Sequence, residues 1–457
     1  MFFPFLELNG WIKRSAVQPQ TNDSEVPQER MIESMTIEQR VDAANARVLE
    51  IMTKGHPVWV DVQPAIDVIP GMTKTTILTP GPGITPDRVT PPQRTSICGA
   101  AIHEGLAATR EEAWAMVERG EIQLVSSQTM NTGNAACMVT SASMPVIVVE
   151  DTTSGGKGFA PIHPGGNPKC LRWGLYDEEV ENDLRWFRDV YGPALGHAVR
   201  AAGGIDVITI LSKTAGMGDE NHNRQPAASM CLALQLIPWL LDIESDQKNA
   251  IIKHFAANDR FFLHVMMAGV EAIMASCKDI ELSTVMVGMG GNGVDFGIQL
   301  AGTGNRWYIT DAPKIKGTFL KPTYKESDLI GYLGDSCVTE VWGLGGMSAI
   351  AGPAYMRLTG SNYAEARSRT EKARAVSLGE HTFAPVPWED MAGFPVGVDA
   401  RKVVGYNILP ISHGGSALRV GGQGGAGAAE LPLDCFKEAL RGIFAQAKEI
   451  MAKEETK

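Results

Sequence analysis

The sequence predicts an α/β protein of the α+β type, in which two mixed α/β domains flank a central helical module. Strand and helix signals alternate near both ends of the chain, whereas the middle carries almost only helical periodicity. The composition, 44% hydrophobic and 20% charged over 457 residues, allows a large buried core. The expected divisions are an extended N-terminal arm at 1–35, an N-terminal α/β domain at 36–176, the helical module at 177–280, and a C-terminal α/β domain at 281–457.

The charge balance excludes two classes of partner. The chain has 41 Lys and Arg against 52 Asp and Glu, a net charge of -11, and it has no run rich in Lys or Arg. Nucleic acids and anionic membrane surfaces attract positively charged proteins, so we expect neither as a partner. The most apolar segments, 231–241 and 261–277, are too short and too interrupted to span a bilayer, and are expected to be buried helices.

The cysteines and the N-terminus predict a cytoplasmic protein. Seven cysteines are scattered without a C-x-x-C pair, which is typical of reduced thiols. Met1–Leu6 is apolar but lacks the basic segment and the length of a signal peptide. We expect this arm to pack on a neighbouring chain, in a homo-oligomer or a hetero-complex.

The N-terminal α/β domain opens with a helix signal. Thr36–Gln39 has capping-box spacing and predicts a helix from Arg40 to Thr53. After Gly55 the pattern changes, and Val58–Val62 is expected to be a strand. The other elements expected in this domain are strand-like or turn-linked segments at 66–69 and 75–78, a loop at 79–83, a capped helix at 109–119, and a strand at 145–150.

The remaining elements follow from hydrophobic periodicity. In the helical module, apolar residues recur at helical spacing in 178–202, 227–241, 246–256 and 261–277. Beyond residue 281 the strand signals return. There we expect strands at 284–289, 294–300 and 306–310, glycine-rich connections at 331–336, 343–346 and 414–427, and a last amphipathic helix at 433–451.

The segment Gly216–Arg224, with the sequence G-M-G-D-E-N-H-N-R, is the densest in reactive groups. It precedes an apolar helix that Pro226 would open, with Asn223 as the expected N-cap. The N-terminus of a helix attracts anions, and Arg224 can form a forked contact with a carboxylate or phosphate. The alternative is a polar surface loop that only caps the helix.

Two segments, Gly288–Gly293 and Gly422–Gly427, match the pattern G-x-G-x-x-G. A dinucleotide site needs a helix directly after the glycines, but strand-like residues follow the first segment and Leu431-Pro432 follows the second. We therefore expect no dinucleotide and no other cofactor. Clustered glycines instead let backbone N–H groups bind anions, or let two backbones pack closely.

Other reactive centres have weak signals. The nine histidines form no H-x-x-x-H or H-E-x-x-H pair, so no metal is expected. A serine nucleophile has no G-x-S-x-G signature, and Cys337 is expected to be a buried structural thiol. Asn292, Asp335 and Glu340 carry donors and acceptors that suit an amide.

Four blocks taken together resemble the YlbE-like family. They are Gly216–Arg224, Ser283–Ile298, Gly334–Gly346 and Gly397–Val404, and their order and spacing match across residues 45–436. Members of this family were long catalogued as a domain of unknown function. The family includes the large subunit of catabolic oxamate carbamoyltransferase.

The resemblance implies an α/β protein with a small helical insert, and a reaction. That reaction is phosphorolysis of a carbamoyl amide such as oxalurate, giving oxamate and carbamoyl phosphate, in a complex with two other kinds of subunit. Small anionic or amide substrates, phosphate and carbamoyl phosphate are therefore expected ligands. Asp219, Glu220 and His222 are the expected catalytic residues. The expected substrate-binding residues are Asn221, Asn223, Arg224, Asn292, Asp335, Ser336, Glu340, Gly345 and Gly346.

One segment departs from the family pattern. Family members carry a histidine-rich patch before the strand at 145–149, whereas this chain has Ser126–Asn134. Asn and Thr side chains bind ligands but do not act as general acids or bases near neutral pH. Two alternatives stay open: a hydrolase of a small cyclic or linear amide, and a non-catalytic scaffold subunit, which the apolar arm and the absence of an obvious nucleophile favour.

Overall fold

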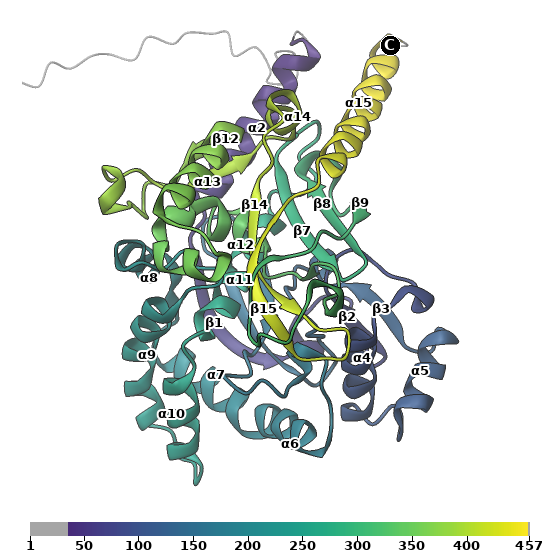
Figure 1. Ribbon diagram of the computed structural model, residues 1–457, viewed down its shortest axis with the longest axis vertical. Coiled ribbons are helices and arrows are strands. Elements are labelled where there is room, and N and C mark those ends of the chain that lie inside the picture. Colours follow the sequence, from purple (N-terminus) through teal and green to yellow (C-terminus); the bar gives the residue numbers. More distant parts are fainter. Residues whose placement is uncertain (1–34, 456–457) are drawn as a thin grey trace, which may run out of the picture.

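The computed structural model describes residues 35–455, and its mixture of helices and several sheets confirms the α/β class (Figure 1). The N-terminal half is built on an antiparallel four-stranded sheet with the order β5-β4-β1-β6. A short parallel pair, β2 with β3, lies outside this sheet. The bounds are β1 Pro57–Pro64, β2 Thr76–Thr79, β3 Gln123–Ser126, β4 Pro145–Asp151, β5 Lys157–Pro161 and β6 Ile205–Asp206.

The C-terminal half contributes three more antiparallel sheets. Their strand orders are β11-β7-β8-β9, β10-β15-β14 and β12-β13. The predicted strands near 284, 294 and 306 are confirmed as β7, β8 and β9. The bounds are β7 Met286–Asn292, β8 Asp295–Leu300, β9 Tyr308–Asp311, β10 Lys316–Phe319, β11 Leu333–Gly334, β12 Ser377–Glu380, β13 Pro395–Val398, β14 Ile411–Ala417 and β15 Gln423–Glu430.

Helix α11, Phe261–Ala275, forms the centre of the core. Every residue from Phe261 to Met274 is buried, as expected for a helix that is apolar on all sides. It packs on β4 and β5, and Gly158 of β5 permits this contact because a Cβ there would lie 2.1 Å from the Ala268 carbonyl oxygen. The predicted buried helix is thus confirmed.

Residues 178–275 are helical apart from β6 and short connections, as the periodicity predicted. The largest hydrophobic cluster draws side chains from all three predicted folded segments, so the division into domains stays a prediction. The helices of this region are α6 Glu178–Trp186, a π-helical turn Phe187–Tyr191, α7 Gly192–Ala201, α8 Val207–Thr214, α9 Pro226–Leu241, α10 Lys248–Ala257 and α11.

The first helix, α2 at Ile37–Lys54, confirms the capping box. Thr36 is the N-cap, and it exchanges hydrogen bonds with Gln39. The strand-like prediction at 66–69 was wrong in conformation, because Ala65–Val68 forms one helical turn, α3, closed by the bond from the Ile69 N–H to the Ala65 carbonyl. The predicted arm at 1–35 lies outside the described residues except for its last residue.

Most of the glycine-rich segment 414–427 belongs to the strands β14 and β15, and only residues 418–422 connect them. A Cβ on Gly425 would lie 2.3 Å from the Thr318 carbonyl oxygen, and one on Gly427 would lie 2.1 Å from that of Lys316. Both carbonyls belong to the neighbouring strand β10. Glycine therefore occurs here because two backbones pack closely, which was one of the two interpretations of these glycines.

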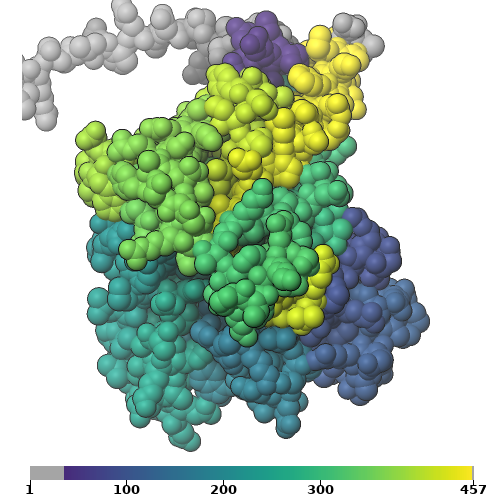
Figure 2. All heavy atoms as spheres, viewed as in Figure 1, coloured from purple at the N-terminus to yellow at the C-terminus, as the bar shows by residue number. Residues whose placement is uncertain are grey.

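Among the other helices α12 is fully buried, and within residues 35–455 no helix combines the length and the apolar character needed to cross a bilayer. In Figure 2 the yellow C-terminal segments lie between green segments on one face, so distant parts of the chain meet there. These helices are α4 Pro91–His103, α5 Arg110–Glu118, α12 Val338–Val341, α13 Tyr363–Val376, α14 Ala400–Tyr406 and α15 Leu433–Glu455.

Candidate active site

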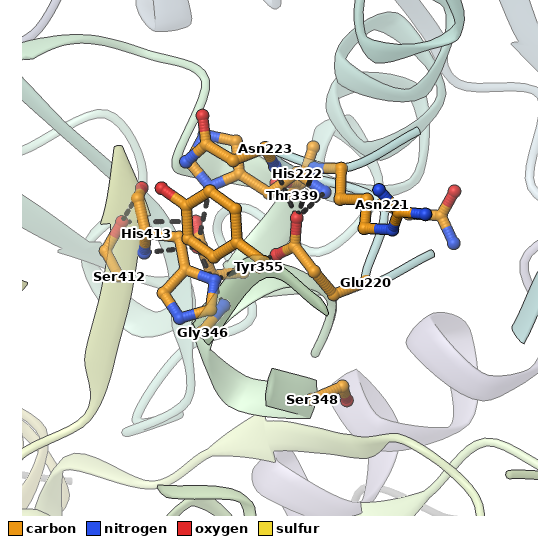
Figure 3. A network of polar contacts seen from close by, with 12 residues as sticks. Glu220, Asn221, His222, Asn223, Thr339, Gly346, Ser348, Tyr355, Ser412 and His413 are labelled. Atoms are coloured by element: carbon orange, nitrogen blue, oxygen red, sulfur yellow. Dashed lines mark hydrogen bonds and ion pairs between the residues drawn. The ribbon is translucent and has the colours of Figure 1, made fainter. Parts of the chain in front are cut away.

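The loop before α9 is buried rather than exposed on the surface. Asp219, Glu220, Asn221 and His222 are each at most 1% exposed. Glu220 shapes the loop, because its Oε1 accepts the N–H groups of residues 222, 223 and 224 at 3.3, 2.5 and 2.6 Å. Figure 3 shows these groups converging on the Glu220 carboxylate. The interpretation as a plain surface loop is therefore wrong.

Glu220 also pairs with a histidine that the sequence analysis did not select. Its Oε2 accepts a hydrogen bond from His413 Nδ1 at 3.0 Å, and both side chains are buried. Burial alone would raise the pKa of Glu220, but the His413 hydrogen bond and charge and the backbone N–H donors hold that pKa below its ordinary value. Glu220 thus remains an anion, which suits a structural role better than proton transfer.

His222 joins Glu340 to Ser336. His222 Nδ1 lies 2.6 Å from Glu340 Oε1, and Nε2 lies 2.8 Å from Ser336 Oγ. Burial tends to lower the pKa of His222, but the charge and hydrogen bond of Glu340 raise it above its ordinary value. This order of serine, imidazole and carboxylate is the geometry by which proteins activate a hydroxyl group.

Glu340 is held in place by several donors. Its Oε1 also accepts the N–H groups of His413 at 2.9 Å and Gly346 at 3.0 Å, and its Oε2 accepts from Ser412 Oγ at 3.2 Å. Gly345 has φ +58°, and a Cβ on it would lie 2.3 Å from Glu340 Oε1. The two glycines therefore support the carboxylate from behind, instead of facing a substrate.

A small cavity of about 10 Å³ lies beside Ser336. Its wall combines two arginines, Arg172 and Arg260, with the Asn223 amide, and strands β14 and β15 close it. Ala136, also in the wall, adopts a left-handed φ of +52°, a conformation that costs an alanine about 1 kcal/mol or more and is common at functional sites.

Arg172 is 8% exposed, and no carboxylate pairs with it within residues 35–455. Its Nη1 contacts His163 Nε2, while its Nε has no hydrogen-bond partner in the described chain. Burial and the nearby Arg260 lower the pKa of Arg172 to about 10, so it stays charged at neutral pH. Arg260 pairs only at 4.0 Å with its exposed neighbour Asp259. The cavity is therefore cationic and lacks a counter-ion.

Asn223 contributes a free donor to the same cavity. Its Nδ2 is buried and has no partner among the described residues. The prediction that Asn223 caps α9 was wrong, because Gln225 is the N-cap residue and makes no side-chain cap bond. The capping contact comes from Asp219, whose Oδ2 accepts the Ala228 N–H at 2.8 Å.

Arg224 does not reach the cavity wall. Its Nε donates to the Gly218 carbonyl at 2.9 Å, and its ion pair with Asp219 Oδ1 spans 3.9 Å. Asn221 likewise turns inward, since it donates to the Asp219 carbonyl at 3.3 Å and adopts a φ of +60°. The structure thus assigns these residues to holding the loop and the start of α9.

Asp335 and Asn292 are engaged by the chain itself. Asp335 accepts from the N–H groups of Gly81 and Asn134 and from the side chains of Ser127 and Gln128. Burial nevertheless raises the pKa of Asp335 to about 6. Asn292 donates to the Pro82 carbonyl and accepts the N–H groups of residues 294 and 295. Neither side chain lines the cavity, so the expected amide contact is not supported.

The segment that departs from the family pattern, Ser126–Asn134, lies behind Ser336. Through Ser127, Gln128 and Asn134 it anchors Asp335, the residue directly before Ser336. The segment therefore supports the candidate site without lining it.

No group of three or more metal-binding side chains occurs within residues 35–455.

Sequence reasoning selected His222, Glu340 and Ser336 but missed Arg172, Arg260 and His413. Arg172 lies in the 3-10 turn Leu171–Trp173, and Arg260 directly precedes α11. A lone arginine in such a context has no distinguishing pattern. Only burial without a carboxylate partner separates Arg172 from ordinary surface arginines.

Fold and site together define a class: a mixed α/β protein with a small cationic cavity next to a Ser–His–Glu arrangement. Residues 122–336 match the family described as oxamate carbamoyltransferase subunit AllG. Oxamate carbamoyltransferase subunit AllG of Escherichia coli K12 is 33% identical over 410 residues, which cover 88% of this chain and 97% of that protein. The chain belongs to the AllG family, and it is a carbamoyltransferase-related subunit.

Two further relatives match over most of their length. The uncharacterized protein YahG of E. coli K12 is 33% identical over 407 residues, which cover 88% of this chain and 86% of that protein. A crystal structure of a conserved protein of unknown function from Enterococcus faecalis V583 superposes with a TM-score of 0.88 at 31% identity, covering 91% of this chain and all of that one. The expected relation to an oxamate carbamoyltransferase subunit is confirmed, under the family name AllG.

Proposed function

We propose that this chain is the subunit of a carbamoyltransferase in which the carbamoyl group is transferred between a small N-carbamoyl compound of the oxalurate type and phosphate. One observation carries the proposal. Buried Arg172, without a carboxylate partner in the described residues, lines a cavity together with Arg260, Asn223 and Ser336. Because an unpaired buried charge is costly, its retention points to an anionic ligand.

The reactants of such a transfer suit this cavity. Phosphate and an α-keto carboxylate are anions, and guanidinium groups bind both through paired N–H donors. The two arginines each offer donors to an anion, and binding of phosphate or a substrate carboxylate requires the cavity of about 10 Å³ to widen. Because Arg172 is buried, water screens its contact with an anion less than it screens a contact on the surface.

The carbamoyl group itself needs a donor for its oxygen. Asn223 Nδ2 is buried, unpaired within the described chain, and lies in the cavity wall, so it is suited to this oxygen. A donor aimed at the charge that develops on this oxygen stabilises the transition state. His222, next to Asn223, supplies the group that accepts and returns a proton.

The proposal is tested with the purified protein, alone and with the subunits that co-purify with it. These samples are incubated with phosphate and a panel of small N-carbamoyl compounds, and carbamoyl phosphate is measured. We expect formation with compounds that carry a carboxylate, and loss of formation in Arg172→Met and Arg260→Met. Absence of carbamoyl phosphate across the panel would reject the proposal.

The Ser–His–Glu arrangement favours a second candidate, an amide hydrolase with water as the acceptor, because hydrolases use the same geometry. Product formation without phosphate would support the hydrolase, and strict dependence on phosphate would exclude it. A non-catalytic scaffold is the third reading, which activity of the chain purified alone would exclude.

We further propose that the chain works in the cytoplasm with other enzyme subunits. The name of the E. coli relative describes a subunit, which supports partners of a different kind. All seven cysteines are free thiols, as expected for a reducing compartment. Mass spectrometry of the complex isolated from its native cell identifies the partners, and recovery of the chain alone would contradict a hetero-complex.

A further inference from the structure

We propose that Ser336 is a nucleophile that carries the carbamoyl group as a covalent serine carbamate. This inference rests on the proposed function and adds an intermediate to it. No sequence signature suggested a nucleophile, yet the fold brings His222 between Ser336 and Glu340, which lie four residues apart in another segment, and the three form one hydrogen-bonded line at the edge of the cavity.

The hydrogen bonds determine which nitrogen of His222 faces the serine as an acceptor. An ionised carboxylate only accepts, so Nδ1 must donate its hydrogen to Glu340 Oε1 at 2.6 Å. In the neutral ring Nε2 is then without a hydrogen, and it accepts the bond from Ser336 Oγ at 2.8 Å. This tautomer is the one that removes a proton from a serine hydroxyl group.

Ser336 Oγ has no structural task that would explain its position. Residue 337 is the N-cap of α12, and that helix has no side-chain cap bond. Thr339 Oγ1 bonds the Ser336 backbone carbonyl, which leaves the Ser336 hydroxyl group to His222. Ser336 is half-buried and forms part of the cavity wall, so its side chain is not fully enclosed by the core.

Neighbouring nucleophiles are committed elsewhere. Cys337 is buried, its Sγ donates to the Met289 carbonyl, and burial raises its pKa well above the ordinary value of a thiol. Ser412 Oγ bonds Glu340 and Tyr332. Of these groups, Ser336 is the one that lines the cavity with a base attached.

The chemistry balances with the groups named. Ser336 Oγ bonds the carbamoyl carbon while the bond from that carbon to the substrate nitrogen breaks. His222 Nε2 takes the hydroxyl proton and gives it to the departing nitrogen, so a neutral amide leaves. A hydrogen phosphate oxygen then attacks the serine carbamate, the bond between Oγ and carbon breaks, and the phosphate proton returns to Oγ through His222. Carbamoyl phosphate and free Ser336 result.

A covalent carbamate predicts a partial reaction without any amide. The active enzyme, with its co-purifying subunits, is mixed with carbamoyl phosphate and radiolabelled phosphate, and exchange of label into carbamoyl phosphate is measured. We expect exchange in the wild type, and a loss of on the order of 10³-fold or more in Ser336→Ala. The exposed Ser327→Ala is the matched control and should retain the exchange.

Peptide mass spectrometry of the wild type after incubation with carbamoyl phosphate should place one carbamoyl group on Ser336, which supports the proposal even if Ser336→Ala does not fold. Three results would overturn it: full phosphorolysis without exchange, exchange that persists in Ser336→Ala, or a carbamoyl group found only on lysines and the N-terminus. The first leaves the proposed carbamoyl transfer intact. Failure of the wild type to form or consume carbamoyl phosphate rejects both the proposed carbamoyl transfer and the serine carbamate.

Discussion

His222 and Glu340, 118 residues apart in sequence, meet with His222 Nδ1 2.6 Å from Glu340 Oε1. The contact joins the loop before α9 to the short helix α12. It links two of the sequence blocks that resemble one family. The position of the imidazole relative to Ser336 therefore depends on a single carboxylate and on the backbone donors that hold it.

Glu340→Gln should reduce turnover by on the order of 10²–10⁴-fold, because an amide no longer stabilises the imidazolium that forms at His222. It should also shift the pH profile. Burial and the charge of Arg172 lower the pKa of His222, whereas Glu340 and Glu220 raise it. Removing the Glu340 charge therefore lowers that pKa, and the acid limb of the rate profile should move to lower pH. An unchanged acid limb would show that His222 does not act as the base.

Arg172→Met should weaken binding of the anionic ligand without lowering the stability of the fold. Loss of the guanidinium should weaken binding of phosphate or a carboxylate substrate by about 1.5–3 kcal/mol, roughly ten- to a hundredfold. Removing a buried charge that has no carboxylate partner in the described chain should leave the melting temperature unchanged or raise it.

Arg224→Ala is the control for this experiment. Arg224 was the expected anion-binding residue, but it lies outside the cavity wall, so its removal should leave ligand affinity near the wild-type value. Phosphate titration and thermal unfolding of both variants test the assignment. A large loss of affinity in Arg224→Ala alone would show that the anion binds at the loop Gly216–Arg224.

Gly345→Ala should inactivate the enzyme by displacing Glu340. Its Cβ would lie 2.3 Å from Glu340 Oε1, and the residue has φ +58°. Gly105→Ala is a matched control, because Gly105 has φ +69° and open space around its Cβ position. Both variants should lose about 1 kcal/mol of stability through backbone strain, whereas only Gly345→Ala should lose turnover. Equal activities would contradict the role of Glu340.

Asp219→Asn should change how stability depends on pH. Burial raises the pKa of Asp219 from 3.8 to about 7. Between these values the unfolded chain has released a proton that the folded chain keeps, so this group makes the wild type less stable as pH rises from about 4 to 7.

Asn cannot ionise, so Asp219→Asn should gain stability relative to the wild type across that interval, by on the order of 2–4 kcal/mol, and hold the gain above it. Chemical denaturation at pH values from 4 to 8 measures the difference. A difference that is constant with pH would show that Asp219 is ionised throughout.

The elements with strong local patterns were predictable. The capping box at Thr36, the all-apolar helix at 261–275 and the strand at 294–300 were confirmed, because each pattern reflects bonding and burial within a few residues. Elements without such patterns were missed, among them α4 and α13, and the glycine-rich strands β14 and β15 were taken for connections.

The candidate site also has features that the sequence predicted and features that only the tertiary structure decided. Sequence alone singled out His222, Ser336 and Glu340 as polar residues in unusual loops, since residue type and neighbouring glycines can be seen locally. Tertiary structure decided that these three form one line, that Arg224 turns away, and that Arg172 supplies the buried charge. The reason is physical: hydrogen bonds and electrostatic contacts depend on separations of a few ångströms, and between distant segments those separations are set by packing of the whole core.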